Sequence, residues 1–255
     1  MIIIRMVIKS HKMFDIHSHI IPRIDDGARD EADALSLLRL AQQDGTTHIV
    51  ATPHIHSGRF ENDQNTIFAG LSTLKKIIKE HSLTINVAAS CELRLDIVHM
   101  AKLMSGEIPT LGTVNGYKIV LLEFPHSHIP PGAENFVKWL FNNGYKPIIA
   151  HPERNRDLLK SPSLLNPYLR LGCLTQVTAG SITGEFGNTV KSYALSLLAQ
   201  DKVDVIASDA HNISRRPPVL SKAYALVTKE FGVEKADTLF KITPQKLTQT
   251  LFDEG

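Results

Sequence analysis

The stretch Phe14-Asp15-Ile16-His17-Ser18-His19 places a short apolar run directly before two histidines that are separated by one residue. Residues two apart on an extended strand project to the same face, so both imidazoles can reach one metal ion. One such pair is a weak signal, because short motifs also occur on surfaces and in cores. Whether the pair belongs to a larger site depends on the rest of the chain.

Six further apolar runs follow along the 255-residue chain, and most are rich in Val and Ile, as buried parallel strands are. They span residues 47–51, 85–89, 118–122, 147–150, 173–177 and 203–207. Stretches with helical spacing of apolar residues lie between most of them and after the last, at residues 30–43, 67–79, 135–142, 190–198, 221–231 and 244–252. Strands that alternate with helices predict a parallel sheet with right-handed crossovers, either open or closed into a barrel.

Imidazoles and carboxylates stand where six of the seven predicted strands end. They are His17, His19, His54, His56, Glu92, Glu123, His151, Asp209 and His211. In a barrel these ends meet at one rim, on which active sites are built. Each motif has an ordinary structural interpretation when it is taken alone, and Asp25-Asp26-Gly27 is equally well a turn. Unrelated structural roles would not share one location, so the sequence favours a joint metal site.

Histidine and carboxylate ligands without thiolate suit Mn²⁺, Fe²⁺, Co²⁺ or Zn²⁺. A carboxylate can bridge two ions, so Glu92 or Glu123 could hold a multinuclear cluster of the kind that hydrolyses phosphoesters. Arg154 and Arg216 lie close to the predicted ligands in sequence, and their guanidinium groups match phosphate oxygens. Backbone amides of the glycine-rich segment 176–187 could line a phosphate or substrate pocket. The roles of His56, His126, His128 and Arg215 are left open.

The amino-acid composition limits the kinds of partner and the cellular location that the sequence favours. A net charge of +2 gives no strong basic field, so nucleic acid is not an expected partner. Cys91 and Cys173 are far apart in sequence, which fits a reducing compartment, and we expect a cytoplasmic location. No apolar stretch is long enough to insert into a membrane.

Residues 1–12 are interpreted as an N-terminal extension, which an upstream start codon would explain, before a single domain at 13–255. The sequence predicts no oligomeric state.

Taken together, the motifs closely resemble the CpsB/YwqE-type bacterial tyrosine-protein phosphatases of the polymerase-and-histidinol-phosphatase (PHP) superfamily. The matching segments are residues 15–19, 24–28, 52–54, 123–125, 150–154, 178–181, 184–187, 208–212 and 216–218. The resemblance runs in order from Met13 to Pro218. One departure is that Ile55 separates His54 from His56, where the family often has consecutive histidines.

The resemblance implies a distorted (β/α)₇ TIM-like barrel and three divalent metal ions, usually Mn²⁺, with Mg²⁺, Co²⁺, Fe²⁺ or Zn²⁺ as the alternatives. Carried over by motif, the first ion is held by His17, His19, Glu92 and Asp209, the second by Glu92, Glu123 and His151, and the third by Asp26, His54 and His211. Arg154 and Arg216 match the phosphate-binding arginines of the family. The usual partner is a bacterial tyrosine autokinase of capsular or exopolysaccharide synthesis, whose tyrosine-rich tail is the substrate.

The sequence therefore predicts a metal-dependent protein-tyrosine phosphatase that forms no cysteine phosphoenzyme. One alternative is another phosphoesterase of the PHP superfamily, such as a histidinol-phosphate phosphatase or a nuclease, of which the near-neutral charge disfavours the nuclease. A second alternative is a non-catalytic regulator that binds a kinase tail. The complete set of family ligands argues against this second alternative.

Overall fold

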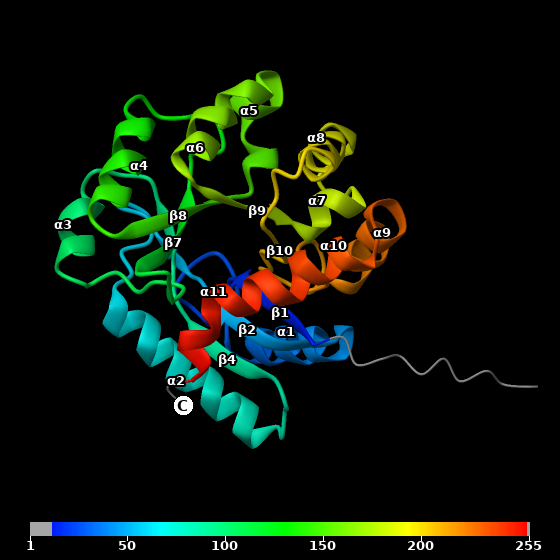
Figure 1. The fold of residues 1–255 in the computed structure, drawn as a ribbon. Helices are drawn as coiled ribbons and strands as arrows, with labels where there is room; N and C mark the ends of the chain where they lie inside the picture. The colour runs from blue at the N-terminus through cyan, green and yellow to red at the C-terminus, as the bar shows by residue number, and fades with distance from the viewer. Residues whose placement is uncertain (1–11, 254–255) are drawn as a thin grey trace, which may run out of the picture.

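The computed structural model describes residues 12–253. Parallel strands form the interior, and helices surround them (Figure 1). Apart from Lys12, the predicted N-terminal extension lies outside the described residues. None of the described helices is both long enough and apolar enough to span a bilayer.

All seven predicted strands are confirmed. They are β1 (Met13–Ser18), β2 (Thr46–Ala51), β4 (Asn86–Ala89), β7 (Tyr117–Glu123), β8 (Tyr145–Ala150), β9 (Leu174–Thr178) and β10 (Val205–Ala207). Three short strands add to them: β3 (His54–Ile55), β5 (Glu92–Arg94) and β6 (Thr113–Val114). Of these, β6 forms an antiparallel pair with β7, whereas β3 and β5 pair in parallel.

The second and third strands of the barrel are each broken, which divides the described strands into two parallel sheets. One sheet has the order β1-β2-β4, and the other has the order β10-β9-β8-β7-β5-β3. Hydrogen bonds continue across the breaks, because Ser90 N–H donates to the Ala51 carbonyl at 2.8 Å and Glu92 N–H donates to the Pro53 carbonyl at 3.1 Å. Thus β3 and β5 prolong β2 and β4 in a new direction.

The barrel closes between β1 and β10. His19 N–H donates to the Ala210 carbonyl and Asp209 N–H donates to the His17 carbonyl, both at 2.8 Å. Within the described residues, the predicted distorted barrel of seven strands is therefore confirmed. Three of these four residues, His17, His19 and Asp209, are also predicted metal ligands.

Six helices coincide with the predicted amphipathic stretches: α1 (Glu31–Asp44), α2 (Gln64–Glu80), α4 (Ala133–Asn142), α8 (Asn188–Ala199), α9 (Ser221–Phe231) and α11 (Thr243–Phe252). The short helices α3 (His99–Met104), α5 (Arg156–Lys160), α6 (Asn166–Leu171), α7 (Ala179–Thr183) and α10 (Val233–Asp237) are additional. Helical turns η1 (Pro152–Arg154), η2 (Pro162–Leu165) and η3 (Thr238–Ile242) link some of them. Such short segments have too few turns to show a helical period in sequence.

Helix α1 shows how local sequence sets a boundary. The Asp30 side chain accepts a hydrogen bond from Asp33 N–H at 2.9 Å and caps the first turn. At the other end, Gly45 has a φ of 99°, a left-handed conformation that is strained for residues with a Cβ. Both capping residues agree with the sequence prediction.

Alternate residues of each strand face different parts of the core. On β7, Ile119 and Leu121 point into the barrel, whereas Val120 and Leu122 pack in the layer between strands and helices. Leu247 of α11 joins the cluster inside the barrel, and the Phe252 ring lies 4.9 Å from the His48 ring near the start of β2. Helix α11 thus covers the amino ends of the strands and leaves the site to the carboxyl ends.

The last residue of α1 also caps another helix. One oxygen of the Asp44 carboxylate accepts hydrogen bonds from Leu220 N–H at 2.6 Å and Ser221 N–H at 2.9 Å, at the start of α9. The other oxygen accepts from the Ser221 hydroxyl at 2.5 Å. These bonds satisfy amides that α9 cannot satisfy itself.

We predict that Asp44→Ala lowers the free energy of unfolding by about 1–3 kcal/mol, because it leaves these donors without their acceptor. Urea denaturation followed by circular dichroism measures the change. Glu80→Ala is the matched control, since Glu80 is 57% exposed and pairs with Lys76 on the surface of α2; it should cost less than about 1 kcal/mol. Equal losses in the two variants would contradict the capping role.

Candidate metal centre

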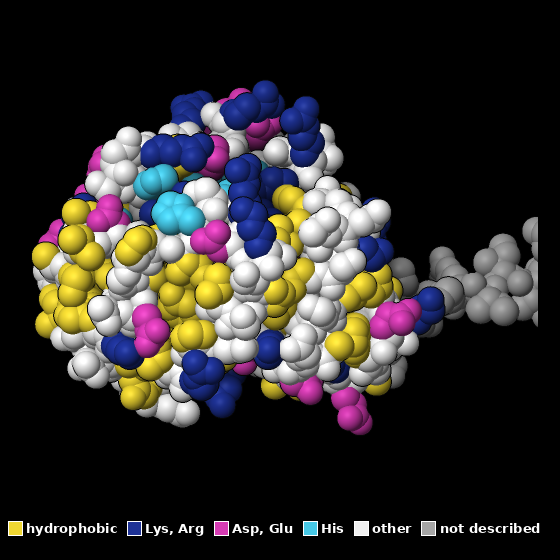
Figure 2. Space-filling view, turned by 90° about the horizontal axis from the view of Figure 1, so that it is seen from above, with side chains coloured by type: hydrophobic (Ala, Val, Ile, Leu, Met, Phe, Trp, Pro, Cys, Tyr) yellow, Lys and Arg dark blue, Asp and Glu magenta, His cyan; other side chains and the backbone are white. Residues whose placement is uncertain are grey.

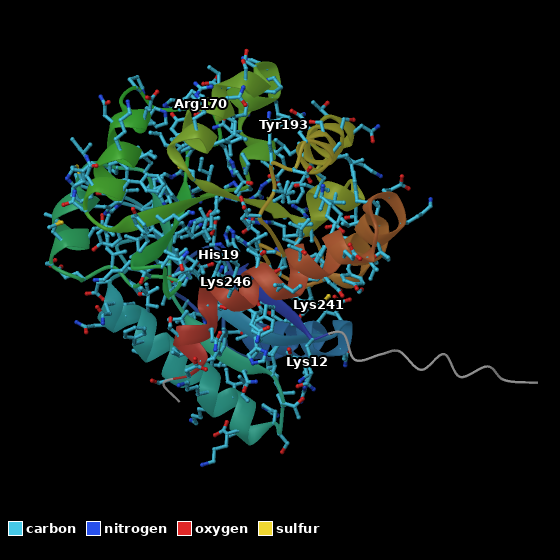
Figure 3. All side chains as sticks on the ribbon, in the orientation of Figure 1. Lys12, His19, Arg170, Tyr193, Lys241 and Lys246 are labelled. Atoms are coloured by element: carbon cyan, nitrogen blue, oxygen red, sulfur yellow. The ribbon has the colours of Figure 1, made fainter. Side chains whose placement is uncertain are left out.

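All nine predicted ligand residues lie at the carboxyl ends of six of the seven predicted strands or beyond them, and His54 and Glu92 begin the short strands β3 and β5 that follow β2 and β4. They come from β1 and the loop after it, from β3, β5 and β7, and from the turns that follow β8 and β10. His19 lies near the middle of the molecule in the view of Figure 3. Seven of the nine side chains are at most 5% exposed, whereas His54 is 12% and Asp26 is 41% exposed. Segments far apart in sequence therefore deliver nitrogen and oxygen donors to one place.

The first donor group consists of His17, His19, Glu92 and Asp209. The Nε2 atoms of the two histidines are 3.3 Å apart. Each lies 3.3 Å from Glu92 Oε2, and the distances to Asp209 Oδ1 are 3.3 Å from His17 and 3.4 Å from His19. This group has the composition that the family resemblance implies.

The second donor group is organised around Glu92 and Glu123. His151 Nε2 lies 2.8 Å from Glu92 Oε1 and 4.0 Å from Glu123 Oε1. His54 joins the group, because its Nδ1 atom lies 3.0 Å from Glu92 Oε2 and 3.9 Å from Glu123 Oε2. Glu92 therefore contacts donors of both groups, as a bridging carboxylate would.

The third donor group lies toward the surface and contains Asp26, His54, His211 and also His19. Asp26 Oδ1 is 3.4 Å from both His54 Nε2 and His211 Nε2. The His54 ring thus presents one nitrogen to the second group and the other to the third. The family resemblance predicts neither this double placement nor the proximity of His19.

Several donor atoms in these groups are buried without a hydrogen bond among the described residues: Glu92 Oε2, Glu123 Oε2, Asp209 Oδ1, His54 Nδ1 and His211 Nε2. Buried polar atoms without a partner are costly. Ligands of one ion at about 2.0–2.2 Å lie about 3.0–3.6 Å apart, which matches most of the spacings above. The residues therefore fit divalent ions, and a donor set of nitrogen and oxygen suits Mn²⁺, Fe²⁺, Co²⁺ or Zn²⁺.

The charges of the site are set by burial and by neighbouring ions. Burial together with the nearby Glu92 raises the pKa of Glu123 to about 7. Burial would also raise the pKa of Asp209, but Arg154 and Arg216 outweigh it and hold that pKa well below its usual range. Asp209 is therefore an anion, although it is only 1% exposed. Positive charge has to accompany such a carboxylate in the interior.

Both predicted phosphate-binding arginines contact Asp209. The Nη2 atoms of Arg154 and Arg216 donate to Asp209 Oδ2, while Oδ1 of the same carboxylate belongs to the first donor group. The Arg154 guanidinium also lies 4.9 Å from the centre of the Phe186 ring. Within the described chain, the Nε atoms of both arginines are buried and have no hydrogen-bond acceptor. Two unused donors thus lie beside the metal-binding groups.

Three residues that contact the ligand side chains were not among the predicted site residues. Asp25 Oδ2 accepts from His19 Nδ1 at 2.7 Å, and Gln176 Oε1 accepts from His17 Nδ1 at 2.8 Å. Such contacts orient the ring and set the tautomer of a ligand histidine. Arg94 Nε lies 3.2 Å from Glu123 Oε2. A glutamine inside an apolar strand was an available signal for Gln176, whereas Asp25 and Arg94 had no distinct signal.

The glycine-rich segment, residues 176–187, is hydrogen-bonded to the turn that follows β8. Its residues form the end of β9 and helix α7, and Thr178 N–H and the Ser181 hydroxyl donate to Glu153 Oε1 at 3.0 and 2.7 Å. These bonds hold the turn that carries His151 and Arg154. The Phe186 ring is the part of the segment that contacts a predicted phosphate-binding residue.

The residues whose roles were left open lie around the same rim. The His126 ring centre is 5.4 Å from that of His151, and His128 is exposed, with Nδ1 2.8 Å from the Ser127 hydroxyl. His56 pairs through its backbone with Phe60. Arg215 is exposed in the loop after His211.

The fold and the buried donor groups define a metal-dependent hydrolase of the α/β-barrel class. Comparison with known proteins identifies the family. Residues 13–249 match the family described as capsular polysaccharide synthesis, CpsB/CapC, and the chain belongs to this family.

Two relatives illustrate the similarity. Tyrosine-protein phosphatase YwqE of Bacillus subtilis (strain 168) is 36% identical over 222 residues, which cover 87% of this chain and 86% of the relative. Tyrosine-protein phosphatase CpsB of Streptococcus pneumoniae is 32% identical over 244 residues, which cover 92% and 98%.

Solved structures agree with this family assignment. A crystal structure from a study of YwqE and CpsB, described as unique metal-dependent tyrosine phosphatases, has a TM-score of 0.86 at 34% identity and covers 93% of this chain and 94% of its own. The phosphotriesterase homology protein of Escherichia coli has a TM-score of 0.59 at 12% identity, covering 92% of this chain and 98% of its own. The latter similarity extends to the fold alone.

We predict that Glu92→Gln lowers the bound metal per chain more than Asp26→Asn does, because Glu92 contacts two donor groups whereas Asp26 contacts one. Inductively coupled plasma mass spectrometry after dialysis against metal-free buffer measures the content. Glu134→Gln is the matched control, since Glu134 pairs with Lys138 on the surface of α4; it should keep the wild-type content. Folded Glu92→Gln protein with undiminished metal would contradict the bridging role.

Proposed function

We propose that this protein hydrolyses phosphotyrosine in a protein substrate with the aid of three divalent ions, usually Mn²⁺. The observation that carries the proposal is that the two oxygens of the Asp209 carboxylate contact different groups. Oδ1 belongs to the first donor group, and Oδ2 accepts hydrogen bonds from Arg154 and Arg216. A phosphate ester that reached these arginines would also reach the metal-binding groups. Both features serve phosphoryl transfer.

The proposed ligands are those implied by the family, with His54 placed between the second and third groups. When bound, the ions supply Lewis-acid charge and lower the pKa of water. Arg154 and Arg216 donate hydrogen bonds to phosphoryl oxygens and stabilise the negative charge that develops during displacement. Asp209 holds both guanidinium groups in place, while Asp25 and Gln176 fix the rings of His19 and His17. A tyrosine phenolate is a comparatively good leaving group, so no side chain has to protonate it fully.

A cysteine phosphoenzyme is not part of this mechanism. Cys91 and Cys173 are both buried and unpaired. Burial raises the pKa of the Cys91 thiol strongly and raises that of Cys173 to about 12. A nucleophilic cysteine requires the opposite shift, toward the thiolate.

The surface supports an anionic protein substrate. On the face shown in Figure 2, histidine side chains reach the surface beside several lysine and arginine side chains, with a few acidic side chains close by, although the whole chain carries a net charge of only +2. Such local charge attracts anions.

We infer further that the substrate is the tyrosine-rich tail of a bacterial tyrosine autokinase that controls capsular or exopolysaccharide synthesis, in the cytoplasm. The family description, capsular polysaccharide synthesis, supports this partner. The two unpaired cysteines fit a reducing compartment.

A substrate panel at fixed Mn²⁺ tests the proposal. Phosphotyrosine peptides and a chromogenic aryl phosphate should be hydrolysed, whereas histidinol phosphate should be a poor substrate. Chelation should abolish turnover, and added Mn²⁺ should restore it. Binding of phosphotyrosine peptides without hydrolysis in metal-loaded protein would support a regulator instead, and preferential hydrolysis of histidinol phosphate would support the other phosphatase activity.

We predict that His151→Ala and Asp209→Ala lower kcat/KM for an aryl phosphate by about 100-fold or more, because each removes a proposed ligand. Cys91→Ser and Cys173→Ser should retain turnover, since neither thiol takes part. Initial rates at equal concentrations of folded protein measure both effects. Loss of turnover after thiol alkylation, with metal content intact, would contradict the mechanism.

We also predict that Arg154→Ala or Arg216→Ala lowers kcat by about 100- to 1000-fold, the loss typical of a donor that stabilises developing charge. Metal content, measured on the same samples, should change far less than in Asp209→Ala. Arg216→Lys should recover part of the loss, because lysine keeps the charge but not the planar fork. A wild-type kcat in an alanine variant would show that the arginine replaced there takes no part in the mechanism.

A further inference from the structure

A pocket of about 410 Å³ adjoins the third donor group, between the loop after β1 and the loop after β10. Asp26 connects the two features, because it lines the pocket and also contacts His54 and His211. The volume lies within the range of small-ligand sites, roughly 300–1,000 Å³. The proposed phosphatase mechanism gives this pocket no role.

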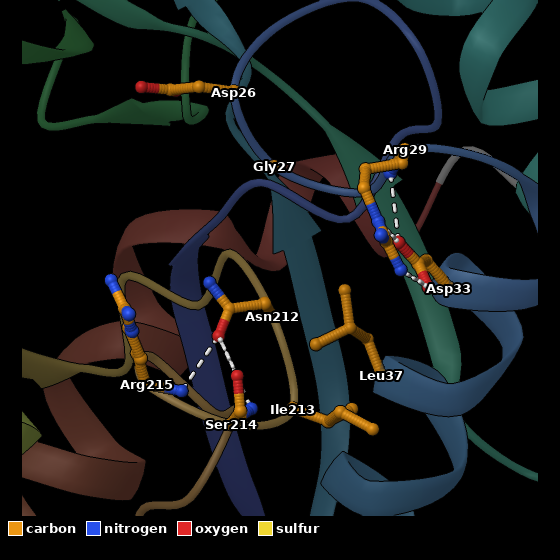
Figure 4. A pocket seen from close by; sticks show the side chains of 9 residues that line it. All are labelled: Asp26, Gly27, Arg29, Asp33, Leu37, Asn212, Ile213, Ser214 and Arg215. Carbon is orange, nitrogen blue, oxygen red and sulfur yellow. Dashed lines mark hydrogen bonds and ion pairs between the residues drawn. The ribbon is translucent and has the colours of Figure 1, made fainter.

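The walls of the pocket differ in chemistry. Leu37 and Ile213 supply apolar surface and, in the view of Figure 4, stand between the Arg29–Asp33 pair and Arg215. Arg29 and Asp33 neutralise each other through two hydrogen bonds, Nε to Oδ2 at 2.5 Å and Nη2 to Oδ1 at 3.0 Å. The Asp26 carboxylate is engaged by the histidines and by Arg59 at 3.3 Å.

Arg215 is therefore the charged side chain of the pocket lining that has no ion-pair partner among residues 12–253. Among residues 12–253, no carboxylate lies within ion-pair distance of its guanidinium. The neighbouring Arg216 differs, since it donates to Asp209 in the metal centre. Consecutive arginines thus serve two regions, the phosphate-binding side and the pocket.

The loop that presents both arginines is held by the Asn212 side chain and by backbone hydrogen bonds from His211 N–H and Asn212 N–H to the Arg216 carbonyl, at 2.9 and 3.2 Å. Asn212 Oδ1 accepts hydrogen bonds from Ser214 N–H at 3.2 Å, Arg215 N–H at 2.7 Å and Arg216 N–H at 3.3 Å. Figure 4 shows two of the contacts within this loop. The backbone at Arg215 is therefore ordered before any ligand binds, which lowers the entropic cost of binding.

We propose that this pocket binds the residues next to the phosphotyrosine of the substrate and that Arg215 selects an acidic side chain there. Leu37 and Ile213 would contact the aliphatic part of that side chain, and the guanidinium would pair with its carboxylate. Because Asp26 adjoins both regions, one peptide can occupy the pocket while its phosphate meets Arg154 and Arg216. This inference rests on the proposed phosphotyrosine phosphatase function.

The test uses phosphotyrosine peptides that carry a single glutamate at successive positions before and after the phosphotyrosine, with glutamine and lysine at the same positions as controls. Full-length, Mn²⁺-loaded wild-type protein should show a kcat/KM about two- to fivefold higher for glutamate than for glutamine at one or two adjacent positions, the size expected of an exposed ion pair. The preference should shrink at high salt.

Arg215→Glu should invert this preference, so that lysine becomes the favoured residue at the same position. Arg170→Glu is the matched control, since Arg170 is an exposed arginine on α6, away from His19 in Figure 3; it should keep the wild-type preference. Equal rates for all peptides in wild type, or an unchanged preference in Arg215→Glu, would overturn the inference while phosphotyrosine hydrolysis itself persists. An equal loss of turnover on every substrate in Arg215→Glu would also overturn it, by assigning Arg215 to the phosphate site. No hydrolysis of any peptide would refute the phosphatase function itself.

Discussion

The structure depends on balancing negative charge that is buried at the mouth of the barrel. Glu92, Glu123 and Asp209 are each at most 3% exposed, and they lie among histidines rather than in water. Arginines balance part of this charge, because Arg154 and Arg216 donate to Asp209 and Arg94 lies beside Glu123. Several donor atoms have no hydrogen bond within residues 12–253, and they face one another across distances that suit divalent ions. Metal binding is thus the physical reason for an arrangement that would otherwise be costly.

The residues that stabilise the barrel and the residues of the metal centre lie in different parts of the fold. Apolar side chains fill its interior, and α11 covers the amino ends of the strands, so the core is complete without the site. The breaks in the second and third strands redirect β3 and β5, which carry His54 and Glu92. Non-glycine residues adopt left-handed backbone conformations after two other strands, at His151 with φ of 33° and at Asp209 with φ of 53°. Strained conformations of this kind cluster at functional sites.

Much of this organisation was predictable from the sequence. The seven strands and six longer helices follow from apolar periodicity, and the common location of the ligands follows from residue types at strand ends. The roles of Asp25 and Arg94 were not predictable, because a supporting contact depends on which side chains the closed barrel places within about 3 Å of each other. A glutamine inside an apolar strand marks Gln176 as unusual, but the sequence does not reveal that His17 is its partner. Nor does residue spacing reveal that His54 uses both ring nitrogens or that Asp209 joins the arginines to the first donor group. These features depend on rotamers and on strand breaks, which leave no periodic signal.

The central claim is that the three donor groups hold metal ions in the active protein. Anomalous X-ray diffraction from crystals of protein purified without added metal, with data collected on both sides of the absorption edge of each metal detected by X-ray fluorescence, tests it most directly. We expect anomalous peaks within bonding distance of each donor group, with Glu92 Oε2 and Oε1 adjoining different peaks. Catalytically active crystals with no anomalous peak at these residues, or with metal bound elsewhere, would contradict the claim.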